Sequence, residues 1–456
     1  MSWILLRLKS VFIRNVAFPM METMKGNQIR RHLRELQASE SLSSSGLQQL
    51  QDNMLRTLLL HTIDHVPFYK EYAHLRPLIE KDPGAALRRF PVLTKEMVRT
   101  EFDRLISDQA KREHMILNRT GGSTGQPTQF YMDRLTVEYY EAARWRGLNW
   151  WGIHIGDPCV MIWGSPIELT RQQLQTQRLK DRLLKNQVFI PSFDLHKEKI
   201  AEYLDLIDSY HPVYLFGWAS ALVLFAEFML TESRKLRRPI KAVLNTAEML
   251  YPHDRLLIEK AFECPVINEY GARDGGLLAY ECPSGNMHLN VETAWIEVVD
   301  IDTKEPVATG EKGLIVITDL HNFVMPRLRY QLGDVVSLSD ETCTCKRALP
   351  LLKSLEGREN DTFIALDGAY VNGQFFTNLA RILPTIRQFQ VVQKSRNELV
   401  LRILQHDQLD QVDIDAFREG ILERMGKINV IVELVPEIAR QSSGKYRTSI
   451  REFSLN

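Results

Sequence analysis

The chain has 456 residues, 44% of them hydrophobic, which is enough for a large buried core and for more than one domain. Its 57 basic and 57 acidic residues cancel to a formal net charge of zero. Nucleic-acid-binding proteins normally carry a basic excess, so we expect no nucleic-acid partner. Five cysteines are too few for a disulfide scaffold in a chain of this length.

The apolar N-terminal segment MSWILLRLKSVFIRNVAFPMM is interrupted by Arg7, Lys9 and Arg14. A membrane-spanning helix needs roughly 20 mostly apolar residues, and a signal peptide needs an unbroken apolar region, so we expect neither. Two interpretations stay open: a helix that packs on the body of the protein, or a basic amphipathic helix that touches a membrane surface. We expect a cytoplasmic protein whose membrane contact, if any, runs through this segment alone.

The next elements in chain order predict an α/β protein. Residues 46–64 place Leu, Met and Ile at helical spacing. The segments PVYLFGW (212–218) and KAVLNTAEM (241–249) are expected to be buried strands. A helix with Pro near its start (252–262) and a strand, PVINEYG (265–271), follow. A strand, a helix and a strand of these lengths predict a parallel strand pair.

The predicted secondary-structure pattern changes in the last third of the chain. Residues 294–320 predict a β-hairpin with turn residues in its middle, and a compact α+β module follows Gly357. This module consists of strand segments at 388–404, a helix at 411–425 and a strand at 428–435.

We therefore predict an α/β fold with two domains. The large N-terminal domain, with mixed sheets and helices, spans residues 1–356 and begins with a helical lead-in at 1–75. The small mobile α+β domain spans 357–456, and its hinge lies near 357–361.

The segment NRTGGSTGQPTQF (118–130) contains three glycines, three threonines and a serine, a composition typical of anion-binding loops. A phosphate loop of the GxxxxGK[ST] type lies between a strand and a helix and carries a lysine. Here Gln126 follows Gly125, and the residues after it alternate like a strand. A loop between two strands would hold its anion with backbone N–H groups and three hydroxyls, those of Ser123, Thr124 and Thr128.

Five motifs occur in a fixed order: RTGGSTGQPT, NEYGARDGGLLAYEC, MPRLRYQLGD, EGREND and SSGKYR. Together with the upstream pair HVPFYK and FPVLTKEMV, they resemble the adenylate-forming ligases from about Leu47 to the C-terminus. The resemblance is to the phenylacetate-CoA ligase-like branch, which includes capsular-polysaccharide-biosynthesis-type members.

The resemblance implies an ATP-dependent enzyme that joins a carboxylic acid to AMP, releases pyrophosphate and passes the acyl group to a thiol, most simply CoA. An amine, a sugar or a carrier protein in polysaccharide or natural-product biosynthesis stays open as the acceptor. A non-catalytic nucleotide-binding homologue is a further alternative, because Gln126, Asp274 and Asn360 depart from the family pattern. A phosphoryl-transferring NTPase is disfavoured by the strand after the loop.

By resemblance, one group of residues binds ATP and AMP. The glycine loop would hold the departing phosphates, and the backbone at Glu269–Gly271, with Tyr270 stacking, would face the adenine. Asp334, which follows a glycine at the expected end of a strand, would accept the ribose hydroxyls. Asp274 takes the place of the family's Mg²⁺-binding Glu. The loop residues implied are Thr120, Gly122, Ser123, Thr124 and Gly125.

The resemblance also implies residues that act between the two domains. Lys445 would be the adenylation lysine, which stabilises negative charge on the reacting carboxylate and α-phosphate. Arg358 would lie near the ribose or the phosphates. Asn360 occupies the hinge position, where the family more often has an acid.

The acid-binding pocket is expected near four residues: Trp163, Trp218, Ser220 and Glu248. The two tryptophans could form an aromatic wall, although core packing explains them equally well. We expect a monomer or a homodimer whose partners are a small carboxylic acid and an acyl acceptor.

Two cysteine pairs remain. Cys282 and His288 flank a Gly turn, and Cys343 and Cys345 lie two apart, so the four predict a closed structural zinc site of the Cys₃His type. Such an ion would tie the loop after Tyr270 to the segment before the hinge. We expect the remaining two cysteines, 159 and 264, to be core residues.

Overall fold

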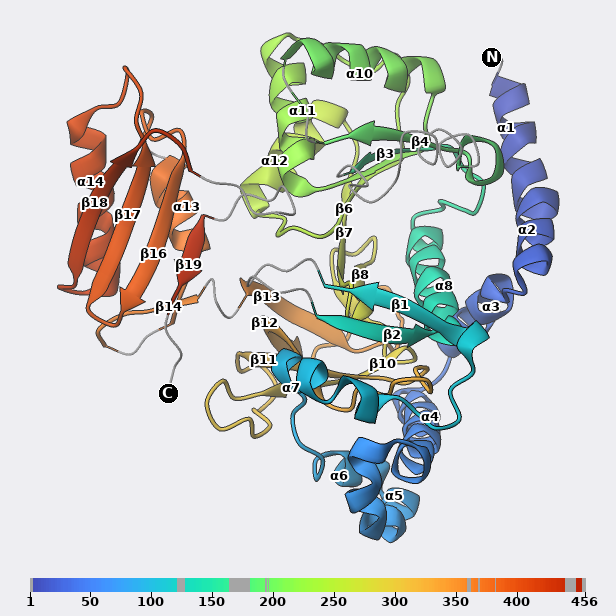
Figure 1. Cartoon of the computed structure of the whole chain (residues 1–456). Helices are drawn as coiled ribbons and strands as arrows, with labels where there is room; N and C mark the ends of the chain where they lie inside the picture. Colours follow the sequence, from blue (N-terminus) through green and yellow to red (C-terminus); the bar gives the residue numbers. More distant parts are fainter. Residues whose placement is uncertain are drawn as a thin grey trace.

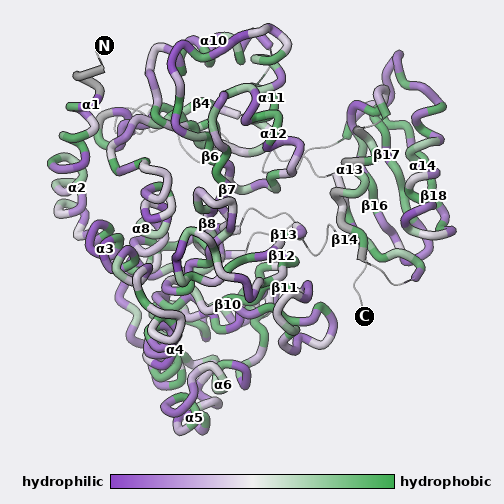
Figure 2. The backbone as a smooth tube through the Cα atoms, turned by 180° about the vertical axis from the view of Figure 1, so that it is seen from behind, coloured by the Kyte–Doolittle hydropathy of each residue, from purple (hydrophilic) through white to green (hydrophobic). Residues whose placement is uncertain are grey.

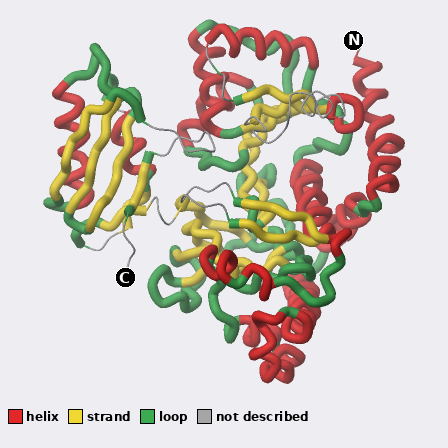
Figure 3. The backbone as a smooth tube through the Cα atoms, in the orientation of Figure 1, coloured by secondary structure: helices red, strands yellow, loops and turns green. Residues whose placement is uncertain are grey.

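The computed structural model describes residues 3–120, 128–163, 181–192, 195, 197–358, 362–367, 370–381, 383–438 and 448–452. An 11-stranded sheet forms the centre of the main body, in the strand order β10-β11-β12-β13-β9-β8-β7-β6-β5-β3-β4 (Figure 1). Helices cover this sheet, so the predicted α/β fold class is confirmed (Figure 3). No described helix is long and apolar enough to cross a membrane.

One half of the sheet is parallel. Each strand pairs in parallel with its neighbour, and the strands carry many buried apolar residues. Figure 2 colours much of this part of the backbone as hydrophobic. The strands are β3 (Cys159–Trp163), β4 (Gln187–Pro191), β5 (Tyr214–Gly217), β6 (Ala242–Asn245) and β7 (Val266–Ala272). Helix α12 (Pro252–Phe262) connects β6 to β7, as the strand–helix–strand pattern predicts.

The other half of the sheet is antiparallel. Its strands are β8 (Gly276–Glu281), β9 (Met287–Leu289), β10 (Ala294–Val299), β11 (Gly313–Asp319), β12 (Tyr330–Ser339) and β13 (Leu351–Arg358). Strands β10 and β11 form the predicted hairpin, in which Ala294 pairs with Asp319.

Helices pack on both faces of the sheet. Those that surround the parallel half are α8 (Arg134–Trp150), α10 (Lys197–Tyr210), α11 (Ala219–Thr231) and α12, with the π-helix η5 (Asp181–Lys185) beside β4 (Figure 1). Arg146 of α8 is fully buried and pairs with Glu292 at 2.6 Å, while it also donates to the carbonyl oxygen of Leu36 at 3.1 Å. Removing one partner of a buried ion pair leaves an uncompensated charge, so this pair holds α8 to the segment between β9 and β10. The hydrogen bond to Leu36 joins α8 to α3 (Ile29–Ser39) of the lead-in.

The described segment that precedes the first strand, residues 3–114, is mostly helical, and its first part is the expected lead-in, 1–75. It comprises α1 (Trp3–Phe12), the π-helix η1 (Ile13–Ala17), α2 (Phe18–Lys25), α3 (Ile29–Ser39), α4 (Ser44–His65), η2 (Pro67–Leu75), α5 (Arg76–Lys81), α6 (Pro83–Leu87), α7 (Lys95–Thr100), η3 (Phe102–Leu105) and η4 (Arg112–His114). Helix α4 covers the predicted segment 46–64, and the hydroxyl of Ser43 caps it by accepting from the N–H of Gly46.

A separate hairpin holds the glycine loop. Strand β1 (Met115–Arg119) pairs antiparallel with β2 (Gln129–Asp133), so Asn118 lies opposite Phe130. The loop therefore connects two strands, as predicted, and no helix N-terminus follows it directly, because α8 begins only after β2 ends.

The C-terminal unit has a sheet and a hydrophobic core of its own. The sheet order is β18-β17-β16-β19, with α13 (Gln374–Arg381) and α14 (Gln411–Met425) beside it and the short pair β14 (Thr362–Ile364) and β15 (Tyr370–Asn372) at one end (Figure 1). The strands are β16 (Phe389–Ser395), β17 (Glu398–Leu404), β18 (Asn429–Val435) and β19 (Ser449–Arg451). The domain boundary and the mobility of this unit stay predictions.

Candidate active site at the carboxyl ends of the parallel strands

Most of the predicted site residues that the structure describes lie at or just beyond the carboxyl ends of parallel strands. Trp163 ends β3, Trp218 follows β5, and Glu248 follows β6 by three residues. Glu269 lies within β7, close to its end. In open α/β sheets, ligands bind outside the carboxyl ends of the strands. Residues far apart in the sequence thus meet at one edge of the sheet.

The side chain of Glu269 takes part in a buried hydrogen-bond network. Its carboxylate accepts two hydrogen bonds of 3.0 Å from the guanidinium of Arg144 and a third, of 2.9 Å, from the hydroxyl of Thr246. A bidentate guanidinium–carboxylate pair fixes both groups geometrically. Glu269 therefore anchors the end of β7 to α8, and only its backbone is left to face a nucleotide.

The four predicted pocket residues come together. The rings of Trp163 and Trp218 lie 5.2 Å apart and inclined at 61°, and Trp163 also stacks on Phe216 at 5.6 Å. The carboxylate of Glu248 accepts from the backbone N–H of Ser220 at 2.9 Å.

The turn that carries Glu248 has an unusual backbone. Ala247 has a φ of 64°, in the left-handed region that non-glycine residues seldom adopt. Such conformations are concentrated at functional sites. The turn therefore marks this end of β6 as a candidate binding surface, whereas the sequence alone left core packing equally open.

Two of the sequence motifs are joined by reciprocal hydrogen bonds. The hydroxyl of Tyr270, in NEYGARD, donates to Asp334 at 2.8 Å, and the hydroxyl of Tyr330, in RYQLGD, donates to Asp274 at 2.8 Å. All four side chains are buried. Each motif thus orients the carboxylate of the other, although neither contact is visible in the sequence.

From the glycine before it, we expected Asp334 to lie at the end of a strand, but it does not. It lies inside β12, opposite Arg358 of β13, and Gly333 precedes it with a φ of 87°. This positive φ suits glycine and accompanies an irregular strand pairing at the next residues. A ligand would therefore reach Asp334 from the face of the sheet.

Lys95 is a candidate site residue that the sequence reasoning missed. Its ammonium group lies 3.9 Å from the carboxylate of Asp274 and donates to the carbonyl oxygen of Leu332 at 3.2 Å. Its side chain is 29% exposed, so it remains accessible to a ligand. The glycine loop has no lysine, and this residue brings a positive charge to the neighbouring carboxylate. The motif FPVLTKEMV was the available signal.

Backbone pairing positions Lys95. The N–H of Leu93 donates to the carbonyl oxygen of Arg329, and the N–H of Gln331 donates to that of Leu93, both at 3.0 Å. Thr94 then caps α7 by accepting from the N–H of Met97. The segment before Lys95 is thus attached to the start of β12.

Arg329 holds the same segment from the other side. Its guanidinium donates to the carbonyl oxygens of Arg88 and Phe90 at 3.3 and 3.0 Å and pairs with Glu297 at 3.3 Å. The arginine of the RYQLGD motif is therefore a structural residue that positions the segment before Lys95, rather than a ligand of the nucleotide.

Arg327 is a second cation that the sequence reasoning missed, although it lies in the motif MPRLRYQLGD. It is 2% exposed and lies over the rings of Phe130 and Tyr330, at 4.2 and 5.0 Å from their centroids. Its guanidinium nitrogens have no hydrogen-bond partner among the described residues. Phe130 belongs to the glycine-loop hairpin, so this charge lies directly behind the loop's supporting strand.

The base of the glycine loop is closed by threonines. The N–H of Thr120 donates to the carbonyl oxygen of Thr128, and the N–H of Thr128 donates to the Thr120 hydroxyl, both at 2.9 Å. We expected the Thr128 hydroxyl to hold an anion, but it is buried and accepts a hydrogen bond of 3.2 Å from Arg99. This hydroxyl therefore ties the hairpin to α7.

Several predicted residues cannot be placed. Gly122, Ser123, Thr124, Gly125, Asn360 and Lys445 lie outside the described residues, as does Gln126. Arg358 ends β13, and only its backbone position is described. Their roles stay predictions.

The four predicted metal ligands lie together. The donor atoms of Cys282, His288, Cys343 and Cys345 are all within 4.8 Å of one another. The sulfurs of Cys282 and Cys343 are 3.6 Å apart, far longer than a disulfide bond. Two thiolates at ~2.3 Å from a tetrahedral zinc ion are separated by roughly 3.8 Å, so the spacing fits such an ion.

The surroundings of these residues also suit a metal. The Nδ1 atom of His288 lies 3.0 Å from the carbonyl oxygen of Leu349, which favours a proton there and leaves Nε2, 3.1 Å from the Cys345 sulfur, as the ligand atom. The backbone N–H of Cys345 and the side-chain amide of Asn286 donate to the Cys343 sulfur at 3.4 and 3.3 Å. Cys159 and Cys264 are buried in the core, as predicted.

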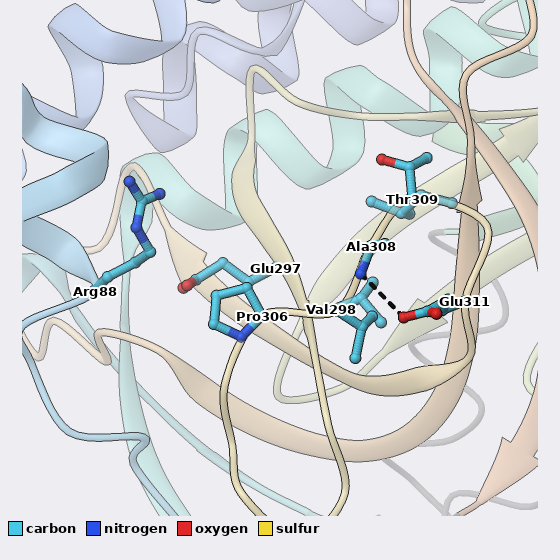
Figure 4. Close-up of a pocket in the computed structure, with 9 residues that line it drawn as sticks. Arg88, Glu297, Val298, Pro306, Ala308, Thr309 and Glu311 are labelled. Carbon is cyan, nitrogen blue, oxygen red and sulfur yellow. Dashed lines mark hydrogen bonds between the residues drawn. The ribbon is translucent and has the colours of Figure 1, made fainter.

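A surface cavity elsewhere does not contain the predicted site. It has a volume of about 130 Å³, smaller than a typical small-molecule pocket of roughly 300–1,000 Å³ (Figure 4). Its lining includes Arg88, Glu297, Pro306 and Glu311, and none of the predicted site residues.

Comparison with known proteins supports the reading of the motifs. Residues 363–452 match the family described as the CapK C-terminal domain. The chain is 25% identical over 395 residues to Protein CapK of Staphylococcus aureus, covering 85% of each chain. It is 23% identical over 371 residues to the phenylacetate-coenzyme A ligase of Thermus thermophilus, covering 79% of this chain and 81% of the relative. A crystal structure of 2-hydroxyisobutyryl-CoA ligase in complex with 2-HIB-AMP superposes with a TM-score of 0.68 at 19% identity, over 91% of each chain.

Fold and motifs together point to one class of protein: the chain is similar to adenylate-forming ligases, as the motifs predict. Within that class the resemblance is to the phenylacetate-CoA ligase-like branch, in which the relatives include CapK.

Proposed function

We propose that the protein activates a carboxylic acid with ATP and passes the acyl group to a thiol, most simply CoA. A carboxylate oxygen attacks the α-phosphorus of ATP, the bond to the bridging oxygen breaks, and pyrophosphate leaves. The thiol sulfur then attacks the acyl carbon, the bond to AMP breaks, and the thiol proton passes to solvent. The observation that carries this proposal is the reciprocal pairing of Tyr270 with Asp334 and of Tyr330 with Asp274.

The ATP site would be built from both motifs. Asp334 would accept the ribose hydroxyls, and the backbone beside Tyr270 would face the adenine. Asp274, with phosphate oxygens, would hold Mg²⁺, which neutralises phosphate charge when bound. Lys95 is close enough to Asp274 to share the same phosphates.

Several cations around the site would neutralise the negative charge of the reacting acid and of ATP. Both the acid and ATP are anionic, so the site must supply positive charge and hold the attacking and leaving groups in line. Lys95 would supply one charge from α7, and the buried Arg327 would add another behind the hairpin. Lys445 and Arg358 would supply the others from the C-terminal side. The glycine loop, from Thr120 onward, would contribute N–H groups and hydroxyls to the leaving pyrophosphate.

The acyl group would lie against the aromatic wall formed by Trp163 and Trp218. Glu248, which is held by the N–H of Ser220, would border the same pocket. These residues favour an acid with a ring or an apolar chain. A rotation of the C-terminal unit about Asn360 would withdraw Lys445 and admit the acceptor.

We further propose that Cys282, His288, Cys343 and Cys345 hold a structural zinc ion, because the set is complete and has no open position. The ion would connect the turn between β8 and β9 to the segment that leads into β13. All five cysteines are free. Free thiols suit a reducing compartment, which supports the expected cytoplasmic location.

Pyrophosphate–ATP exchange with a panel of aryl, fatty and amino acids tests the activation step. We expect exchange with at least one acid, and its loss in Lys445→Ala but not in Lys427→Ala, an exposed lysine of the same unit. Tight ATP binding without exchange for any acid would favour the non-catalytic alternative. Exchange that persists in Lys445→Ala would overturn the role of that residue.

The acceptor is tested separately, after an acid that supports exchange has been found. CoA, amines, sugars and a carrier protein are added in turn, and the product is identified by mass. A thioester with CoA supports the proposal. An amide, an ester or a carrier-bound acyl group would replace CoA as the acceptor and leave the activation step intact.

A further inference from the structure

The chain begins with a single long helix on one edge of the molecule (Figure 1). Helix α1, the π-helix η1 and α2 follow one another without a break, because the residues at their junctions, Phe12, Ala17 and Phe18, all have right-handed helical dihedral angles. The helix ends at Gly26, which has a φ of 69° and donates its N–H to the carbonyl oxygens of Glu22 and Thr23. It is roughly 35 Å long at 1.5 Å per residue.

The inner side of this helix is firmly attached to the protein. Ile13 and Phe18 are buried, and Arg14 donates to the carbonyl oxygen of Ile155 at 3.0 Å and pairs with Asp157 at 3.2 Å. A side chain at Gly156 would approach the carbonyl oxygen of Ser10 to 2.6 Å, so only glycine allows the helix to lie this close. The rotation of the helix, and therefore its outward face, is fixed by these contacts.

The outward face of the helix is apolar. We call it the N-terminal apolar face, and its members are Leu8, Val11, Phe12, Val16, Met20 and Met24. Leu8, Phe12 and Met20 are 57–59% exposed, and Met24 is 85% exposed. Single exposed apolar residues are common on protein surfaces, but a row of them on one helix marks an interaction surface.

The π turn reduces the rotation of this row of side chains around the helix axis. Five of its members recur every four residues, from Leu8 to Met24. In an α-helix such a row drifts by about 40° per step, because four residues exceed one turn of 3.6. The wider turn at Ile13–Ala17 holds more residues and absorbs part of this drift. Leu8 and Met24 are therefore closer to one face than they would be in an uninterrupted α-helix.

The solvent-exposed charged residues of the helix are all basic. Arg7 and Lys25 are exposed and Lys9 is half-buried, whereas the only acidic residue between Met1 and Lys25, Glu22, is buried beneath Arg30. Arg182 of η5, whose carbonyl oxygen accepts from Lys9, adds a further exposed cation beside the helix. The protein as a whole has no net charge, so this basic edge is a local asymmetry.

We propose that the N-terminal apolar face docks on an anionic lipid bilayer, with the helix lying in the plane of the membrane surface. Bulky apolar side chains flanked by lysine and arginine are the features that such a surface selects. The nearby carboxylate of Asp181 in η5, 25% exposed, is paired with Lys185. A second copy of the chain fits less well, because a two-fold contact between these faces would bring basic residues such as Arg7 and Lys25 together without an acidic partner.

Vesicle flotation of the full-length protein tests this proposal. Vesicles of phosphatidylcholine with phosphatidylglycerol are compared with vesicles of phosphatidylcholine alone. We expect the protein to float with the anionic vesicles, and at least tenfold less of it in the double variant Phe12→Glu/Met20→Glu. The matched control, Leu256→Glu/Val412→Glu, places two carboxylates at exposed apolar positions elsewhere and should float as the wild type does.

The other arms separate the apolar from the electrostatic contribution. Arg7→Gln/Lys25→Gln should lower flotation with anionic vesicles and leave the weak flotation with neutral vesicles unchanged. No flotation of the wild type with either vesicle would overturn the proposal. It would also be overturned if sedimentation showed a dimer that Phe12→Glu/Met20→Glu converts to a monomer while flotation stays the same, because the face would then join two copies.

Discussion

Tyr330 donates a hydrogen bond of 2.8 Å to Asp274, across 56 positions of the chain. Tyr270 and Asp334 form the mirror contact, also at 2.8 Å. The two carboxylates proposed to bind the metal and the ribose are thus oriented by one another's motifs. A substitution in one motif should therefore weaken the binding of the ligand that the carboxylate of the other motif holds.

Exchange of the two tyrosines for phenylalanine tests this coupling. A hydrogen bond to a charged group contributes about 1.5–3 kcal/mol, so its loss should weaken the ligand that the carboxylate binds by roughly tenfold or more. We expect Tyr330→Phe to raise the Mg²⁺ concentration for half-maximal exchange, and Tyr270→Phe to raise the KM for ATP. Tyr72→Phe is the control. Equal effects of both variants on Mg²⁺ would contradict the assignment.

Lys95 should be needed for ATP although it lies outside the glycine loop. Lys95→Met removes a charge next to Asp274, and the loss of one charge-assisted hydrogen bond predicts a roughly 10- to 100-fold lower kcat/KM for ATP. Lys95→Arg should retain part of the activity. Lys81→Met, at an exposed position of α5, serves as the control. A wild-type KM for ATP in Lys95→Met would remove Lys95 from the site.

Removal of the proposed zinc ion should destabilise the protein. Metal analysis of protein purified without a chelator should find one zinc ion per chain, and Cys345→Ser should lose it. Because the site ties β9 to the segment before β13, we expect the loss to cost about 3 kcal/mol, or roughly 3–4 °C in Tm for a body of this size. Cys264→Ser, outside the cluster, should keep the metal. Zinc-free protein of unchanged stability would refute the site.

The stability of the protein should fall between pH 6.5 and pH 4 in part because of His321. The ring stacks on Tyr139 at 3.6 Å and bonds the carbonyl oxygen of Glu292, and burial lowers the pKa of His321 to about 4. Between pH 6.5 and pH 4, His321 is therefore protonated in the unfolded chain but neutral in the folded protein. The full difference corresponds to about 3 kcal/mol, lost as the pH falls towards 4.

His321→Gln separates this contribution from the others. The variant loses the ring stack and should be less stable at pH 7, but its free energy of unfolding should vary less between pH 6.5 and pH 4. His74→Gln, at an exposed histidine, should leave the wild-type slope unchanged. Equal slopes in His321→Gln and the wild type would show that this histidine is not responsible.

Much of the fold could be predicted from local pattern. The helix at 252–262 was predicted to the residue, because Pro marks its first turn and apolar residues recur at helical spacing. The hairpin at 294–320 and the helix at 411–425 were equally visible. The placement of Asp334 was wrong, because a glycine with a positive φ can lie inside an irregular strand as well as at its end.

The sequence by itself indicated the similarity to adenylate-forming ligases and the candidate metal site, because the order of short motifs and the Cys/His spacing are properties of the chain alone. The tertiary structure decided which groups meet. The crossed pairs of Tyr270 with Asp334 and of Tyr330 with Asp274 depend on strand order, which local pattern does not encode. The approach of Lys95 to Asp274, and the outward direction of Phe12, depend on packing between segments far apart in the chain.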